Sequence, residues 1–198
     1  GINAPNTRLV VSAGNDIAID APGSLSLVLD GLDLTAGGRV SMNSTVHTSI
    51  TTSQGIDVRG RDVALNGQNM LLNGGTGLRL EAGAGNLTVD STNLSAAAGL
   101  AQLRSTGGDT RLTTNGLTLA GSNVEVSAAN DLQVGVSGTI SLAAANTTFS
   151  AGRDLTQSSG FAFGQGSPSQ VSMSAGRDIR LQNSSVGLER LSVNATRD

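Results

Sequence analysis

Residues 151–155 read Ala-Gly-Arg-Asp-Leu, and residues 175–179 repeat the phrase as Ala-Gly-Arg-Asp-Ile. Phrases of the same kind, in which a turn of small and polar residues is followed by a strand-forming residue, recur along the whole chain. The residue after the turn is number 17, 40, 63, 87, 110, 132, 155 or 179, so the period is nearly constant. Such a regular period is typical of repeat architectures, in which each repeat stacks only on its neighbours.

Each period contains three short segments with apolar residues at positions i and i+2. In the period that begins at Val63, these segments are residues 63–65, 70–72 and 78–80. This spacing indicates β-strands, because alternate side chains of a strand point to the same face. Such short strands can stack on their own copies one period away. We therefore predict a right-handed parallel β-helix of about eight coils of about 23 residues, with three short strands per coil.

The repeat covers residues 9–193, which predicts a single domain over residues 1–198 with irregular ends at 1–8 and 194–198. Leu9 to Val11 already match the third segment of a coil, and no capping segment is visible at either end. We therefore expect the chain to be part of a longer rod whose uncapped ends associate end to end.

Two aromatic residues fall in the least regular stretch of the chain. Phe161 and Phe163 are expected in the second segment of their coil, followed by an exposed excursion at residues 164–168.

The composition excludes several classes of function. The 198 residues include 27 Gly and no Cys or Trp, and only 2% are aromatic, so the predicted core is thin and aliphatic. The net charge of −3 argues against binding to nucleic acid or anionic membranes. No apolar run approaches the roughly 20 residues of a membrane span, so membrane insertion is not expected. Without Cys, disulfides and thiolate metal sites are excluded.

The turns before the first segment carry a recurring polar residue. We expect Gly and Asn to supply left-handed backbone at these corners, and Asp to bind the corner backbone. The flanking Arg61, Arg153 and Arg177 are expected to neutralise the acidic column in part. The column reads Asp16, Arg39, Asp62, Asn86, Asp109, Asp131, Asp154 and Asp178.

Five arginines are the candidate binding residues. Arg59, Arg61, Arg153, Arg177 and Arg180 could contact sulfated glycans through bidentate hydrogen bonds. Each also has an Asp nearby, so purely structural ion pairs are the alternative.

No residues of the sequence form a recognisable catalytic or metal-binding set. His47 is the only histidine and is expected in a solvated turn, which excludes a multi-histidine metal site. The run Gly74–Gly77 precedes no helix, so it is interpreted as a corner and not as a phosphate loop. The Asp residues lie one period apart, with no long loop to wall a cleft. We predict no enzyme activity and no cofactor.

The phrases Ser-Ala-Gly-Arg-Asp-Ile at 174–179 and Ala-Gly-Asn-Asp-Ile at 13–17 resemble the repeats of filamentous haemagglutinin. Those repeats build the shafts of two-partner-secretion exoproteins of Gram-negative bacteria, including adhesins and contact-dependent growth inhibition effectors. The resemblance implies a structural shaft segment, secreted or at the cell surface, that extends an adhesive or toxin-bearing tip. The implied partners are an outer-membrane transporter during export and a host or neighbouring cell surface. The alternative is a carbohydrate-binding, polysaccharide-cleaving or phage-spike β-helix.

Overall fold

The computed structural model describes residues 2–158, 170–182 and 190–196, and it contains strands and turns throughout these residues. All strand pairs in it are parallel. The strands are β1 (Ile2–Ala13), β2 (Ile17–Ala21), β3 (Leu25–Ala36), β4 (Arg39–Ser44), β5 (His47–Gly60), β6 (Asp62–Ala82), β7 (Leu87–Ser105), β8 (Thr110–Ala128), β9 (Leu132–Val136), β10 (Ile140–Ala151), β11 (Leu155–Ser158), β12 (Gln170–Ala175), β13 (Ile179–Leu181) and β14 (Arg190–Ala195).

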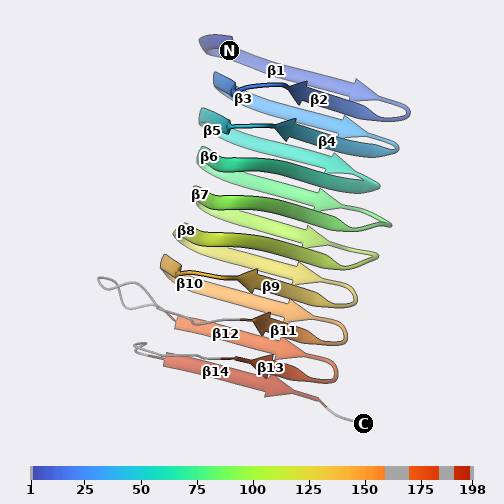
Figure 1. The fold of residues 1–198 in the computed structure, drawn as a ribbon, viewed down its shortest axis with the longest axis vertical. Coiled ribbons are helices and arrows are strands. Elements are labelled where there is room, and N and C mark those ends of the chain that lie inside the picture. The colour runs from blue at the N-terminus through green and yellow to red at the C-terminus, as the bar shows by residue number, and fades with distance from the viewer. Residues whose placement is uncertain (1, 159–169, 183–189, 197–198) are drawn as a thin grey trace.

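The chain winds as a single rod, with β1 at one end and β14 at the other (Figure 1). The nearer strands run to the left and the fainter, more distant strands run to the right as the coils descend, so the coil is right-handed. The predicted right-handed parallel β-helix of about eight coils is therefore confirmed.

The three predicted segments of each coil stack on their own copies and form three walls. We number the walls in chain order, so that residues 63–65, 70–72 and 78–80 belong to the first, second and third wall. Leu65 lies opposite Met42 in the preceding coil and Val89 in the following one, as the period predicts. We call the residues that share one position in successive coils a column.

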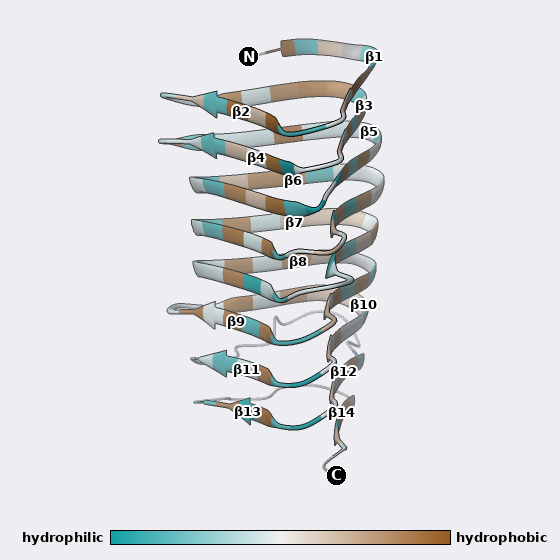
Figure 2. Ribbon diagram, turned by 90° about the vertical axis from the view of Figure 1, so that its right-hand side faces the viewer, coloured by the Kyte–Doolittle hydropathy of each residue, from teal (hydrophilic) through white to brown (hydrophobic). Residues whose placement is uncertain are grey.

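The interior between the walls is filled by aliphatic columns. Hydrophobic and hydrophilic residues alternate along the strands (Figure 2), and the inward members of each wall are buried. Leu65, Leu80 and Val126 have no exposed surface. Phe149 is the largest fully buried side chain among the described residues, so the core is aliphatic for almost its whole length, as the composition predicts.

The boundaries of the strands differ from the prediction in two respects. In β3, β5 and β10 the second and third segments form one continuous bent strand, and in β6, β7 and β8 the first segment belongs to the same strand as well. Pairing continues around the corner between the second and third walls with only a register shift, as between Gly74 and Gly77. The ends at 1–8 and 194–198 were expected to be irregular, but β1 pairs with β3 from Ile2 onward and β14 extends to Ala195. Phe161, Phe163 and the excursion at 164–168 lie outside the described residues.

The glycines at the corners are needed for a different reason from the one predicted. Among the described glycines only Gly121 has a positive φ, of 156°, so the expectation of left-handed glycine corners is wrong. What the corners require is close approach of successive coils. A Cβ atom placed on Gly37 would lie 2.3 Å from the carbonyl oxygen of Gly14 in the preceding coil, which no side chain could occupy.

Candidate functional site: the polar corner and the outer face of the third wall

The corner between the third wall of one coil and the first wall of the next is held by side-chain to backbone hydrogen bonds. Asp16 Oδ1 accepts a hydrogen bond from the backbone N–H of Arg39 at 2.8 Å, 23 residues later. Asn86 Oδ1 accepts one from the N–H of Asp109, also at 2.8 Å. In the same way, Asp109 Oδ1 accepts a hydrogen bond from the backbone N–H of Asp131, and Asp131 Oδ1 accepts one from the N–H of Asp154. The prediction that Asp binds the corner backbone is confirmed, and the bound backbone is that of the following coil.

The backbone completes this bond pattern in the opposite direction. The carbonyl oxygen of Asp109 accepts a hydrogen bond from the N–H of Leu87 in the preceding coil, at 3.0 Å. Leu132 donates in the same way to Asp154, at 2.9 Å. Each corner therefore exchanges bonds with its neighbours on both sides, which satisfies backbone groups that the turn would otherwise leave unpaired.

The five candidate arginines all form ion pairs with Asp. Arg153 binds Asp131 of the preceding coil through two contacts of 3.0 and 2.6 Å, and Arg177 binds Asp154 in the same bidentate way. The other three pairs lie within a coil and are Arg59 with Asp57, Arg61 with Asp62 and Arg180 with Asp178. The predicted partial neutralisation of the acidic column is thus present, while glycan contact stays a prediction.

The structure does not gather these arginines into one patch. Arg153 and Arg177 occupy the same corner position in adjacent coils. Arg61 lies on the same corner four coils away, which corresponds to roughly 19 Å at the usual strand spacing. Arg59 lies on the outer face of the third wall in β5, and Arg180 lies on the first wall in β13. The five arginines therefore fall into two separate groups, Arg59 with Arg61 near one end of the rod and Arg153 with Arg177 and Arg180 near the other.

We expect Arg153→Ala to leave the melting temperature of the chain within experimental error of the unmodified protein. The Arg153 side chain is about half exposed, at 54%, and exposed ion pairs contribute little to stability because water and salt screen them. Thermal denaturation followed by circular dichroism measures this. Arg8→Ala, at another exposed ion pair, is the control. If Arg153→Ala clearly lowers the melting temperature and Arg8→Ala does not, the assignment of Arg153 to an exposed, weakly stabilising ion pair is contradicted.

Two carboxylates of the corner column have pKa values below the ordinary value for Asp. The N–H of Asn86 and the guanidinium of Arg61 lower the pKa of Asp62, because both stabilise the carboxylate. The guanidinium of Arg177 lowers the pKa of Asp154. A carboxylate with a lowered pKa stabilises the fold at pH values above its unfolded-state pKa. This contribution is lost as the pH falls through the folded-state pKa.

We therefore expect the free energy of unfolding to fall below about pH 4, and Asp62→Asn to lessen that fall. An amide can serve as the acceptor without titrating, as Asn86 does in the same column. Urea denaturation at pH 7 and pH 3 measures the difference, with Asp90→Asn on the exposed face of β7 as the control for loss of one charge. If Asp62→Asn loses as much stability between the two pH values as the unmodified chain, the carboxylate has no such role.

A cluster of charged side chains on the outer face of the third wall is centred on Glu81. Its carboxylate binds Arg104 at 2.9 Å in the next coil and also binds Arg79. Partial burial would raise the pKa of Glu81, but the hydrogen bonds from Arg104 and Arg79 outweigh this effect and lower it. The cluster links two coils and leaves no charge of Glu81 uncompensated.

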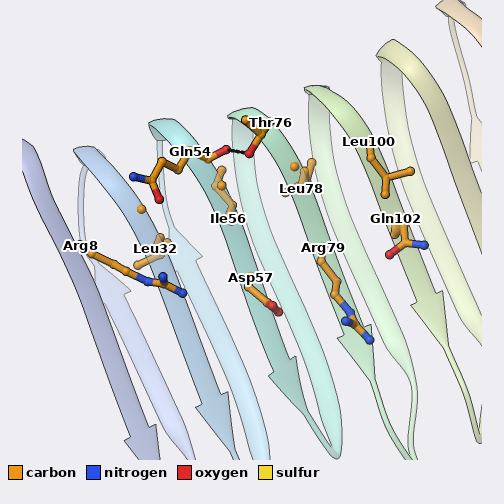
Figure 3. Close-up of a pocket in the computed structure, with 13 residues that line it drawn as sticks. Arg8, Leu32, Gln54, Ile56, Asp57, Thr76, Leu78, Arg79, Leu100 and Gln102 are labelled. Atoms are coloured by element: carbon orange, nitrogen blue, oxygen red, sulfur yellow. Dashed lines mark hydrogen bonds between the residues drawn. The ribbon is translucent and has the colours of Figure 1, made fainter.

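A groove of about 290 Å³ lies beside this cluster, where the second wall turns into the third (Figure 3). Its floor is a column of three glycines, Gly31, Gly55 and Gly77, which lie opposite one another in successive coils. Gln54 and Thr76 come from the corner on one side, and Figure 3 shows Arg8, Asp57, Arg79 and Gln102 along the other. Leu100, 44% exposed, closes the column.

The remaining hollows and candidate residues lie elsewhere. A groove of about 590 Å³ at the corner between the first and second walls is lined by hydroxyl and amide side chains, among them Thr113, Asn115 and Gln182. His47 begins β5 opposite Asn69 and is partly buried, so the expectation that it lies in a solvated turn is wrong. Gly74–Gly77 form the predicted corner within β6. Within the described residues, no group of His, Asp and Glu could hold a metal ion.

The grooves can form hydrogen bonds but offer little acid–base chemistry. Among the described residues, Asp57 is the only carboxylate that lines the groove of Figure 3, whereas glycoside hydrolysis uses two facing carboxylates. The sequence contains a signal for this groove. Gly31, Gly55 and Gly77 recur at almost the period of the repeat, and they occupy an outward position where neighbouring coils carry Arg8 and Leu100.

Comparisons with protein-family models, curated proteins and solved structures find no match. Within the described residues, no helix has the length and apolarity needed to span a membrane.

Proposed function

We propose that this chain is a structural shaft segment of a large secreted or cell-surface exoprotein of a Gram-negative bacterium. In this role it extends an adhesive or toxin-bearing tip and has no chemistry of its own. The observation that carries the proposal is the stacking of coils within the described residues, whose third-wall strands pair in parallel one after another from β1 to β14. Each added coil lengthens such a rod by roughly 4.8 Å without changing the coils beside it.

The corner bonds support the same role. A shaft has to resist bending and local opening along its whole length. The side-chain oxygens of Asp62, Asn86, Asp109 and Asp131 each accept a hydrogen bond from a backbone N–H of the following coil. These bonds join one coil to the next, in addition to the backbone pairing of the walls. These polar side chains could otherwise bind a ligand, but they form hydrogen bonds between coils instead.

The proposed partners follow from the filamentous haemagglutinin resemblance of the Ala-Gly-Arg-Asp phrases. They are an outer-membrane transporter of the two-partner-secretion type during export, and a host or neighbouring cell surface that the complete protein contacts. The exoprotein is an adhesin or a contact-dependent inhibition effector.

Removal of one whole coil from the exoprotein tests the proposal. Deletion of residues 88–110 joins Leu87 to Arg111, and Leu87 then takes the place of Thr110, its register partner. Export and the activity of the tip should be retained, because a spacer tolerates a change of one coil in length. Loss of the tip activity in a deletion protein that still folds and is exported would show that this segment acts in its own right.

Glycan binding is the second candidate, and the groove of Figure 3 is the observation that favours it. The groove runs along the rod over five strands, from Arg8 in β1 to Gln102 in β7, as a linear ligand would require. An array of neutral and sulfated glycans distinguishes the sites. Loss of binding in Arg153→Gln with Arg177→Gln would assign the arginine corner, and loss in Gln54→Ala with Gln102→Ala would assign the groove. The shaft proposal predicts no binding in either case.

A further inference from the structure

The floor of the groove in Figure 3 is made of glycine, although packing between the coils does not demand glycine at two of its three positions. A Cβ atom on Gly77 would lie 3.9 Å from the carbonyl oxygen of Leu100, which is an ordinary van der Waals distance. On Gly31 it would lie 3.3 Å from a carbon of the flexible Arg8 side chain. Only Gly55 approaches backbone closely, at 3.2 Å from the Gly77 oxygen, and none of the three glycines has a positive φ.

The same column carries side chains in the other coils. Arg8 precedes the three glycines, and Leu100, Asn123 and Asn146 follow them in successive coils. Glycine inside a strand weakens the strand, and it commonly marks a place where a ligand or another backbone approaches closely. The next coil leaves the space above Gly77 open, so the glycines indicate a ligand that lies directly on the backbone.

The groove combines an apolar floor with two polar rims. The three glycines pair with one another in the ladder, so their peptide groups bond along the rod and the floor presents methylene groups and peptide faces. Gln54 and Thr76 form one rim, and Arg79 and Gln102 lie on the other (Figure 3). A flat ring with apolar faces and hydroxyl groups at its edges fits this arrangement, which is the form of a sugar ring in a β-linked chain. The protein has no Trp or Tyr on which such a ring would stack, so the backbone itself supplies the flat surface.

The charged side chains of the groove are neutralised by neighbours on the third wall. The ion pairs are Arg8 with Asp33, Arg79 with Glu81 and Asp57 with Arg59. An anionic ligand would have to compete with Asp33 and Glu81 for the guanidinium groups. A hydroxyl group needs no such exchange, because each guanidinium has five N–H donors and its ion pair occupies only some of them. The groove therefore favours an uncharged ligand.

We propose that this groove binds an uncharged, linear, β-linked glycan, whose sugar rings lie flat on Gly55 and Gly77 and whose hydroxyl groups meet the two rims. From Arg8 to Leu100 the column advances by four coils, roughly 19 Å at the usual strand spacing, so several rings fit in a row. The inference rests on glycan binding, the second candidate function, and it gives the shaft segment a lateral binding site in addition to its length.

Filling the floor of the groove tests the proposal. Gly77→Leu places there the side chain that the next coil carries at Leu100. In isothermal titration calorimetry, the unmodified chain should bind cellohexaose or chitohexaose. Gly77→Leu should bind the same probe at least tenfold more weakly, and Gly77→Ala should show a smaller loss. Gly83→Leu is the matched control and should bind like the unmodified chain. Gly83 follows β6 at another corner of the rod, where a Cβ would lie 3.6 Å from the carbonyl oxygen of Gly60.

The melting temperature separates loss of the site from loss of the fold. Gly77→Leu should melt no lower than the unmodified chain, because it replaces a glycine in a strand where a Cβ fits. Unchanged binding in Gly77→Leu, or in Gly77→Ala if the leucine lowers the melting temperature, would overturn the inference. Tighter binding of a heparin hexasaccharide than of both uncharged probes would also overturn it.

Two further outcomes distinguish this inference from the candidate function on which it rests. If binding is lost in Arg153→Gln with Arg177→Gln but not in Gly77→Leu, glycan binding holds at the arginine corner and the groove inference fails. If the unmodified chain binds none of the three probes, glycan binding fails as well and the shaft role stands alone.

Discussion

Leu65→Asp should unfold several coils of the rod together. Leu65 has no exposed surface and lies between Met42 and Val89 in a column of the first wall. The interior is one side chain deep from each wall, so a carboxylate placed there has no water and no cationic partner, and it costs several kcal/mol. In a solenoid each coil depends on its neighbours, so disruption in the middle also removes the packing surface of the adjacent coils. Urea denaturation followed by circular dichroism measures the loss.

Matched variants separate the effect of the charge from that of the lost packing. Leu65→Ala should destabilise by about 2–5 kcal/mol, the usual range for truncation of a buried leucine. Val126→Asp, at another position without exposed surface, should behave like Leu65→Asp. Leu100→Asp, at a leucine that is 44% exposed on the outer face, should have little effect. Equal midpoints for Leu65→Asp and Leu100→Asp would refute the assignment of inward and outward faces.

The register of the walls could be predicted because the period and the alternation constrain each other. A slip of one residue at Leu65 would move every apolar side chain of that strand to the outer face, and the aliphatic column with Met42 and Val89 would be lost. A slip of a whole period is excluded because the chain is continuous. The register partners of each described segment therefore follow from the sequence alone, without knowledge of the distances between coils.

The role of the glycines could not be predicted, because it depends on distances between coils. The sequence places a glycine in most corners, and left-handed backbone is the usual reason for glycine in a turn. In the structure, a Cβ on Gly176 would lie 2.1 Å from the carbonyl oxygen of Gly152, whereas Gly14, at the same corner of the first coil, has nothing within 4 Å. Close packing of one coil on the previous one creates the requirement, and the sequence contains no measure of that distance.

The partners of the arginines could be predicted only in part. The sequence places an Asp directly after Arg61, Arg153 and Arg177, but only Arg61 binds its own neighbour. The preceding coil explains the difference. It offers Asp131 to Arg153 and Asp154 to Arg177, whereas at the acidic position before Arg61 it carries Arg39. Each of these arginines thus pairs with a carboxylate of the preceding coil where that coil carries one at the corner. This preference can be recognised only once it is known which corners stack on each other.

Deletion of one whole coil should leave a folded rod, whereas deletion of half a coil should abolish the fold. Removal of residues 88–110 brings Leu112 into the place of Val89 and Val126 into the place of Leu103, both of them register partners. At the corner, the backbone N–H of Asp131 takes the place of the N–H of Asp109 and donates to Asn86 Oδ1. Every column continues across the junction, so the variant should unfold cooperatively with one coil less of nearest-neighbour stabilisation.

Removal of residues 88–99 instead joins Leu87, which begins a first wall, directly to Leu100, which begins a third. The coils on either side of the junction then lack a second wall between them, and the ladder from β6 to β8 cannot form. We expect this variant to lose its strand signal in circular dichroism and its cooperative melting transition, while the whole-coil variant keeps both. The two deletions begin at the same residue, and the larger one is the tolerated one. If stability simply decreased with the number of residues removed, the larger deletion would be the more damaging one, so the opposite result is specific to coils that stack by a fixed period. Equal loss of structure in both variants would refute the solenoid register.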